Sequence, residues 1–394
     1  MANNTLSIEQ AYAFLGSMYQ QALGVAPNAV NVDSKNFVSV AQAVLQTGYD
    51  NTMAAISQVL GRTIFSIRPY TAKFKGIDVD NQRWGNMTRK INYCDTMIDS
   101  ADESITLTDG SSVDPWSIKK PSVLQTNYYS QQAFQDHVTL FESQLDTVFS
   151  GPEDFARFIS GVLQNMMDKL EMFREEQARA ALINFAAGKA AASNQYVNVL
   201  QAYKDATGTS LTAAGMLSDS SFVPFTKWLY SYINTLTRLM AERTTIYHIN
   251  VTGKEIPRHT PADRLKAYMS ANIMDAIESI ALPSVYGADR LKMVDWEGVS
   301  FWQNVNDPTT IKAKPVYLAT NGTLTEASNT TTINNMIGIL FDEDAINMNR
   351  FMQRVDRTPI NPRGLYSNLF YHEHVRVAND FTENAIVLYA ADPT

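Results

Sequence analysis

Residues 150–188 read SGPEDFARFISGVLQNMMDKLEMFREEQARAALINFAAG, and this stretch decides the fold. Ser150 is suited to cap a helix, a proline follows in the first turn, and Glu153 completes the reciprocal capping pattern. Apolar residues then recur at helical spacing as far as Phe185, and Gly188 is expected to end the helix. Roughly 35 residues at about 1.5 Å each predict a rod about 50 Å long, well beyond the usual three or four turns. So long a helix indicates an elongated subunit with this helix as its spine.

The first sixty residues predict three short amphipathic helices, at about 8–22, 34–47 and 51–60. Apolar residues recur at helical spacing, and Gly48 and Gly61 are expected to end the second and third helices. Helices this short cannot bury their apolar faces among themselves, so each needs a larger neighbour. We therefore expect an arm that packs on something else.

Residues from about 62 to 135 differ in character, because polar and turn residues dominate and the apolar positions lack helical period. Within them, Ser104–Gly110 alternates like a strand and runs into an Asp-Gly turn, which predicts a hairpin. A free two-stranded hairpin is marginally stable in water and has two open edges. We expect this segment to lie on a neighbour.

Beyond residue 200 helices and strands alternate, which predicts a mixed α/β unit. We expect helices near 225–240 and 260–280, with a strand at 244–251 between them. Further strands are expected at 290–296, 315–320, 336–342, 364–378 and 383–390.

The composition limits the function further. Charged residues make up 18% of the 394, against roughly 25% in a typical soluble domain, which suggests that much of the surface is covered by partners. The net charge of −8 argues against affinity that comes from neutralising phosphates or from anionic membranes. The single cysteine, Cys94, excludes a disulfide framework and Cys-based zinc sites. Because no signal peptide and no membrane-spanning apolar run is present, we expect a soluble protein made inside a cell.

Catalytic motifs are not found in the sequence. The phosphate-binding loop pattern fails around Gly188-Lys189 and around Gly253-Lys254. The acidic pairs of Asp78 with Asp80 and of Asp342 with Asp344 have the chemistry to hold a magnesium ion, but solvated turn residues are the favoured interpretation. We therefore expect no catalytic, cofactor-binding or metal-ligating residues, and no cofactor.

Two clusters near the C-terminus leave alternatives. His372 and His374 would point to one face of a strand and could share a metal, but no third ligand is evident, so strand or interface histidines are favoured. The densest basic stretch has acidic residues close by, and pairing between subunits is favoured over nucleic-acid binding for its four arginines, Arg350, Arg354, Arg357 and Arg363.

The order of the elements carries a resemblance. A helical arm, a long hairpin, a spine helix, an α/β unit and returning strands resemble the major capsid protein fold of tailed double-stranded DNA phages, most closely that of small short-tailed phages. The residues that carry it are Phe134-Gln135, Phe155, Asn361–Tyr366, Tyr371-His372, Phe381 and Asn384–Val387. The implied fold class is α+β, with a long spine helix, an extended E-loop hairpin and a mixed α/β A-domain.

The resemblance also implies a division of the chain into five parts. These are a helical N-arm (1–61), the E-loop (62–135), a P-domain with the spine helix (136–200), the A-domain (201–345) and return strands to the P-domain (346–394). Many members begin with a long charged scaffolding or propeptide segment. None is visible here, so we expect no cleavage by a maturation protease.

The implied function is that of a major capsid protein, not of an enzyme. The resemblance implies self-assembly into hexamers and pentamers of an icosahedral or prolate head that encloses double-stranded DNA. Its partners would be further copies of itself, the portal, candidate scaffolding or decoration proteins, and packaged DNA contacted non-specifically, with no membrane. The protein would be made in the host cytoplasm and reside in the virion capsid.

Two alternatives stay open at this point. An encapsulin-like nanocompartment shell shares the fold and would hold protein cargo in place of DNA. A metal-dependent α/β enzyme would use His372 and His374 and form a small oligomer with bound metal. Some capsid proteins crosslink through an E-loop lysine; Lys90, Lys119 and Lys120 lie in that region, but no catalytic glutamate marks such a reaction here.

Overall fold

The computed structural model describes residues 8–25, 30–63, 73–79, 88–94, 109–110, 112, 116, 122–129, 131–218, 220–278 and 295–394. Several predictions lie partly or wholly outside the described residues, among them the strand at 290–296, which is described only from Asp295. Others are the strand at 104–110, of which only the turn at Asp109 and Gly110 is described, and the lysines Lys119 and Lys120.

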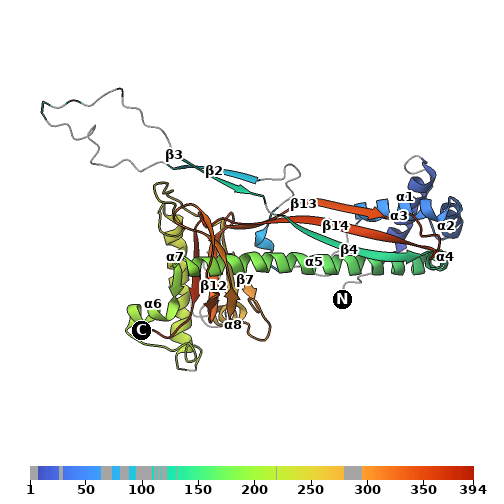
Figure 1. Cartoon of the computed structure of the whole chain (residues 1–394). Coiled ribbons are helices and arrows are strands. Elements are labelled where there is room, and N and C mark those ends of the chain that lie inside the picture. Colours follow the sequence, from blue (N-terminus) through green and yellow to red (C-terminus); the bar gives the residue numbers. More distant parts are fainter. Residues whose placement is uncertain are drawn as a thin grey trace.

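The spine helix is confirmed as α5 (Pro152–Ala191), which is 40 residues long and forms the axis of an elongated molecule (Figure 1). Its N-cap is Gly151, not Ser150, whose hydroxyl instead donates to the carbonyl oxygen of Thr147. Gly188 lies inside the helix and does not end it. A Cβ atom there would come within 2.7 Å of the Phe381 ring, so the absence of a side chain at Gly188 allows this ring to pack closely on the helix.

A four-stranded sheet runs along the spine in the order β1-β13-β14-β4. Its strands are β1 (Asp78–Val79), β13 (Ile346–Arg357), β14 (Tyr366–Asn379) and β4 (Gln132–Phe141). β14 pairs antiparallel with both β13 and β4. Alternate residues of β14 are buried, and several of them pack with the spine helix in the apolar clusters of the chain.

The three N-terminal helices are confirmed as α1 (Ile8–Leu23), α2 (Phe37–Gln46) and α3 (Tyr49–Thr63), with Gly61 inside the third. They share an apolar cluster with the first half of the spine, the sheet and the short helix α4 (Glu142–Val148). Phe155 of the spine is surrounded by the rings of Phe14, Phe37 and Phe149, with centroids 5.2–5.9 Å away. The neighbour that these helices need is therefore the spine of their own chain.

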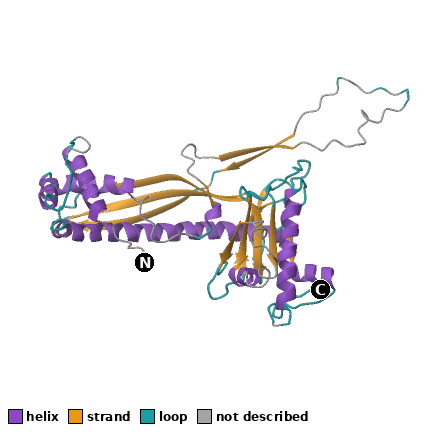
Figure 2. Cartoon of the chain, turned by 180° about the vertical axis from the view of Figure 1, so that it is seen from behind, coloured by secondary structure: helices purple, strands orange, loops and turns teal. Residues whose placement is uncertain are grey.

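A second sheet lies beside the C-terminal end of the spine, in the order β5-β15-β12-β6-β7 (Figure 2). Its strands are β5 (Tyr196–Asn198), β15 (Ala385–Tyr389), β12 (Met336–Asp342), β6 (Leu265–Ser270) and β7 (Asp295–Val299). One apolar cluster joins this sheet to the spine, and another joins it to α6 (Val199–Thr207), α7 (Phe222–Ala241) and α8 (Ala271–Ala276). Two small ladders complete this region: β8 (Ile311–Ala313) with β11 (Thr331–Ile333), and β9 (Val316–Leu318) with β10 (Leu324–Glu326).

Two predictions for the α/β unit are wrong. Residues 244–251 form no strand, only isolated bridges from Thr244 to Arg258 and from Val251 to Lys254. The helix expected over 260–280 begins instead as strand β6, and α8 starts only at Ala271. The reason is tertiary: β6 is paired on both sides, with β12 and β7, and this buried pairing outweighs the local helical spacing.

The hairpin of β2 (Thr88–Cys94) and β3 (Ser122–Tyr128) belongs to neither of the two large sheets and lies above them in Figures 1 and 2. The two strands pair antiparallel in an uninterrupted register. None of their described side chains belongs to any of the three apolar clusters. The attachment of the hairpin to the body must therefore be of another kind.

Candidate functional site

The hairpin presents two different faces. Lys90 and Asn92 of β2 point to the same side, opposite Thr126 and Leu124 of β3, and are partly buried. Ile91 between them points the other way and is 50% exposed. The alternation of the strand therefore turns one lysine and one asparagine toward the body.

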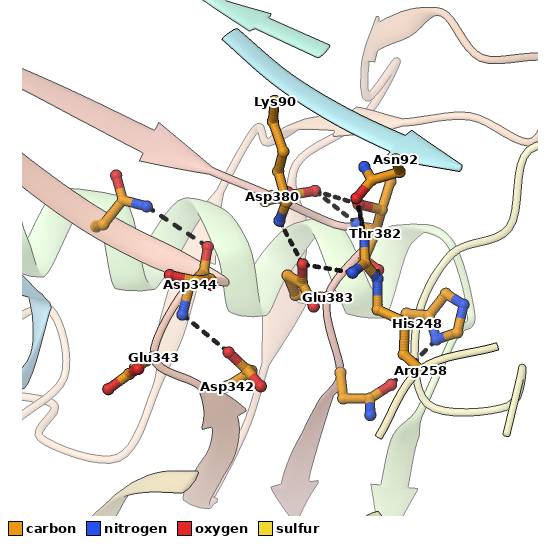
Figure 3. A network of polar contacts seen from close by, with 12 residues as sticks. Lys90, Asn92, His248, Arg258, Asp342, Glu343, Asp344, Asp380, Thr382 and Glu383 are labelled. Carbon is orange, nitrogen blue, oxygen red and sulfur yellow. Dashed lines mark hydrogen bonds and ion pairs between the residues drawn. The ribbon is translucent and has the colours of Figure 1, made fainter. Parts of the chain in front are cut away.

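Charged side chains of the body contact this inner face through ion pairs and hydrogen bonds (Figure 3). Lys90 Nζ lies 2.6 Å from Asp380 Oδ2 and also contacts the Glu383 carboxylate. Glu383 pairs in turn with Arg258 Nη1 at 2.8 Å, and Arg258 Nη2 donates to Asn92 Oδ1 at 3.1 Å. We call Lys90, Arg258, Asp380 and Glu383 the anchor cluster.

The two carboxylates of the anchor cluster come from the turn that joins β14 to β15, and so connects the two sheets. The carboxylate of Asp380 accepts hydrogen bonds from the backbone and hydroxyl of Thr382, at 2.9 and 2.6 Å. The Phe381 ring stacks on Phe185 of the spine, with centroids 4.8 Å apart. The Asp380 backbone N–H donates to Ala345. The body side of the anchor is therefore held in a defined geometry.

Burial and pairing compete in the anchor cluster. Burial alone raises the pKa of Asp380, but the charge of Lys90 and the hydrogen bonds from Lys90 and Thr382 outweigh it, so that pKa lies below its usual value. For Glu383, burial outweighs the attraction of Lys90 and Arg258, and its pKa is raised. Burial alone would lower the pKa of Lys90, but the attraction of the two carboxylates outweighs burial, so this pKa lies above its ordinary value. Lys90 therefore stays charged at neutral pH.

A second polar network lies behind the turn. His248 Nδ1 and Asn384 Oδ1 are 3.0 Å apart, Asn384 donates to Thr260, and Thr260 donates to Asp342. Burial lowers the pKa of His248, so this ring is held neutral and its Nδ1–H is the donor. The network connects the loop at 248 to both ends of the segment between β12 and β15.

One lysine of the spine is wholly buried near this network. Lys189 Nζ donates to Asn194 Oδ1 at 3.0 Å and to the carbonyl oxygen of Tyr247 at 3.1 Å. Burial lowers the pKa of Lys189 to about 7. Lys189 therefore ties the C-terminal end of the spine to the residues around 247.

The histidine pair considered as metal ligands lies on the face of β14 opposite the buried Glu373. His372 stacks over Phe370, and Phe370 stacks over His137 of β4, with centroids 6.2 and 5.3 Å apart. In the part of the chain that the structure describes, no three His, Cys, Asp or Glu side chains gather as a metal site. The structure therefore places His372 in an aromatic stack within the sheet, and both histidines lie on a strand, as the favoured interpretation expects.

The acidic pairs and the arginines find partners that the sequence did not reveal. Asp342 is buried and bonded to Thr260, so it is not a solvated turn residue, and Arg264 pairs with both Asp342 and Asp344. The side chains of Asp78 and Asp80 lie outside what the structure describes.

Two arginines expected to pair between subunits do so within the chain. Arg357 lies 2.6 Å from Asp50 of α3, and Arg354 lies 2.6 Å from Asp356. These two residues therefore have partners within the chain, and their pairing between subunits stays a prediction. The Arg357 pair instead ties the N-terminal helices to β13, because its two residues come from those elements.

Sequence reasoning missed the anchor cluster. Lys90 drew notice only as a lysine of the hairpin region, and Arg258, Asp380 and Glu383 drew none. The available signal was the polar turn Asp380-Phe-Thr-Glu-Asn384, which directly precedes the apolar strand Ala385–Tyr389. Among the described residues, no helix is long and apolar enough to cross a lipid bilayer.

Chains in solved phage structures share this fold. A chain in the capsid structure of Staphylococcus phage Andhra superimposes with a TM-score of 0.51 at 13% sequence identity, covering 83% of this chain and 86% of that one. A chain in the structure of the head fiber and inner core protein gp22 of native bacteriophage P68 gives 0.51 at 10% identity, covering 81% and 84%. No curated protein matches this chain. The architecture is that of a phage capsid protein.

The family follows from the sequence. Residues 14–389 match the model of the Phi29-like phage major capsid protein family, and the chain belongs to that family. It is a structural protein of the bacteriophage virion capsid, and the predicted resemblance is confirmed. This assignment favours the capsid prediction over the nanocompartment and metal-enzyme alternatives.

Proposed function

We propose that copies of this chain assemble into hexamers and pentamers that close an icosahedral or prolate head around double-stranded DNA. The five-part division of the chain belongs to this proposal, with the E-loop reaching over neighbouring copies. The portal and scaffolding or decoration proteins would be further partners. The net charge of −8 disfavours tight binding of the protein to the packaged DNA.

The observation that carries the proposal is the hairpin. It extends from the body without a share in any apolar cluster, and two aromatic residues of its region, Trp116 and Tyr129, are strongly exposed. Burial of such apolar area on an adjacent copy stabilises the contact by roughly 25 cal/mol per Å². Many such contacts would add up to a shell.

The test shortens the hairpin without damage to the body. Removal of all of 62–135 would take away β1 and part of β4, so residues 95–121 are replaced by Asn-Gly, which leaves β2, β3 and the anchor cluster in place. We expect a folded, soluble chain that forms no shells by negative-stain electron microscopy. The control, Leu324→Ser at an exposed site on β10, should assemble normally. Shells of normal form from the shortened chain would refute the proposal.

A further inference from the structure

The hairpin is attached to its own body by polar contacts. Its inner face meets the body through Lys90 and Asn92, which bond to Asp380, Glu383 and Arg258, and through Tyr128 of β3, whose buried hydroxyl lies close to the Asp380 carboxylate. A further contact comes from Lys254 Nζ, which donates to the carbonyl oxygen of Val123 at 3.2 Å. Because the described hairpin side chains belong to none of the three apolar clusters, these charges and hydrogen bonds set the angle at which the hairpin leaves the body.

The body side of this attachment belongs to the junction of the two sheets. Asp380 and Glu383 lie in the turn between β14 and β15, and the adjacent Asn384 accepts a hydrogen bond from the Asp342 backbone at the end of β12. The turn packs on the spine through Phe381, whose ring stacks on that of Phe185. The hairpin is therefore fixed to the point where the spine and both sheets meet.

Such an attachment responds to conditions that an apolar contact resists. The Lys90 side chain is 25% exposed, so water and salt reach one side of its ion pairs. Salt screens charges that are accessible to solvent, with a Debye length of about 3 Å at 1 M ionic strength. Removal of the lysine leaves two carboxylates with less compensation, and solvation of these carboxylates favours movement of the hairpin away from them.

We propose that the anchor cluster is a releasable electrostatic clasp, which holds the β2–β3 hairpin at one angle and lets it swing when its charges are screened or removed. The clasp is a property of the single chain and does not depend on assembly. If the proposed function holds, release would let the hairpin reach neighbours that sit at different angles in hexamers and pentamers.

The test measures the hairpin angle in the full-length chain, kept unassembled by dilution. In a Cys94→Ser background, spin labels are placed at Gln125→Cys on the outer face of β3 and at Arg238→Cys on α7, and double electron–electron resonance gives the distribution of distances between them. We expect one narrow maximum at low salt. It should be lost in Lys90→Met and at about 1 M salt.

The matched control is Arg89→Met, which removes the same charge from the neighbouring residue on the opposite, outer face of β2. This variant should keep the narrow maximum. An unchanged distribution in Lys90→Met, or an equal broadening in Arg89→Met, would overturn the clasp. Should Lys90→Met fail to fold by circular dichroism, the salt titration of the chain with its cluster intact decides: a distribution that stays narrow at high salt overturns the proposal. Neither result depends on whether shells form.

Discussion

The N-terminal helices and the β2–β3 hairpin pose the same physical problem and solve it differently. Neither carries a core of its own, and the sequence predicts for both a need for a neighbour. The helices fill the space around Phe155 with aromatic rings and become part of the body. The hairpin meets the body through charges and keeps Ile91 in water. An apolar interface thus makes one appendage part of the body, while the other is attached mainly through ionic and hydrogen-bonded contacts.

The largest effect should follow from removal of the ring on which the N-terminal helices pack. Phe155→Ala deletes a buried side chain in contact with three other rings, and such a change typically costs about 3–5 kcal/mol. Urea denaturation followed by circular dichroism measures the loss. Met172→Ala on the same helix, at a residue 66% exposed, should change the free energy of unfolding by less than about 0.5 kcal/mol. Equal effects of the two substitutions would show that the helices are not bound through this cluster.

A smaller effect should follow at the junction that carries the anchor. Gly188→Ala puts a methyl group within 2.7 Å of the Phe381 ring, and overpacking of this kind costs typically about 1–3 kcal/mol. Gly161→Ala, in the same helix with open space around it, should be neutral or stabilising. Thermal unfolding of the two variants compares them. A junction that accepts the alanine at 188 without loss would mean that the turn carrying Asp380 and Glu383 is not tightly held.

The acid sensitivity of the same junction has a defined sign. Burial lowers the pKa of His248 below its ordinary value of about 6.5. As the pH falls, the unfolded chain therefore binds a proton at His248 before the folded chain does. The stability from the neutral ring is therefore fully present above about pH 6.5 and is lost as the pH falls toward the folded pKa. The loss is about 1.4 kcal/mol for each unit that separates the two pKa values. Urea denaturation between about pH 7 and pH 5 should show this slope in the unmodified chain and a smaller one in His248→Gln. Identical slopes would show that the pKa of His248 is the same in the folded and the unfolded chain.

Local signals in the sequence predict one class of feature and miss another. The spine and the N-terminal helices are predicted from helical spacing, because the apolar residues that form the buried face of each helix all lie within its own segment. The helix expected over 260–280 fails because the pairing of β6 with β12 and β7 is set by distant residues. The bond from Lys90 to Asp380 joins positions 290 residues apart, and no local pattern records it. Only the family resemblance placed the hairpin and the C-terminal turn in one architecture.

The smallest effect on stability should come from the anchor itself, and this contrast tests the comparison most directly. In Lys90→Met the hairpin can move away and return Asp380 and Glu383 to water, which relieves the cost of two buried carboxylates without their lysine, so the free energy of unfolding of the body should fall by much less than in Phe155→Ala. Brief digestion with a protease should nevertheless cut the hairpin region faster in this variant than in Arg89→Met, while the body survives in both. A loss of stability as large as that of Phe155→Ala would contradict the comparison, because the hairpin would then be as much a part of the folded body as the helices are. A small loss joined to faster cleavage would show that the chain holds its two appendages by different forces, one of them readily undone.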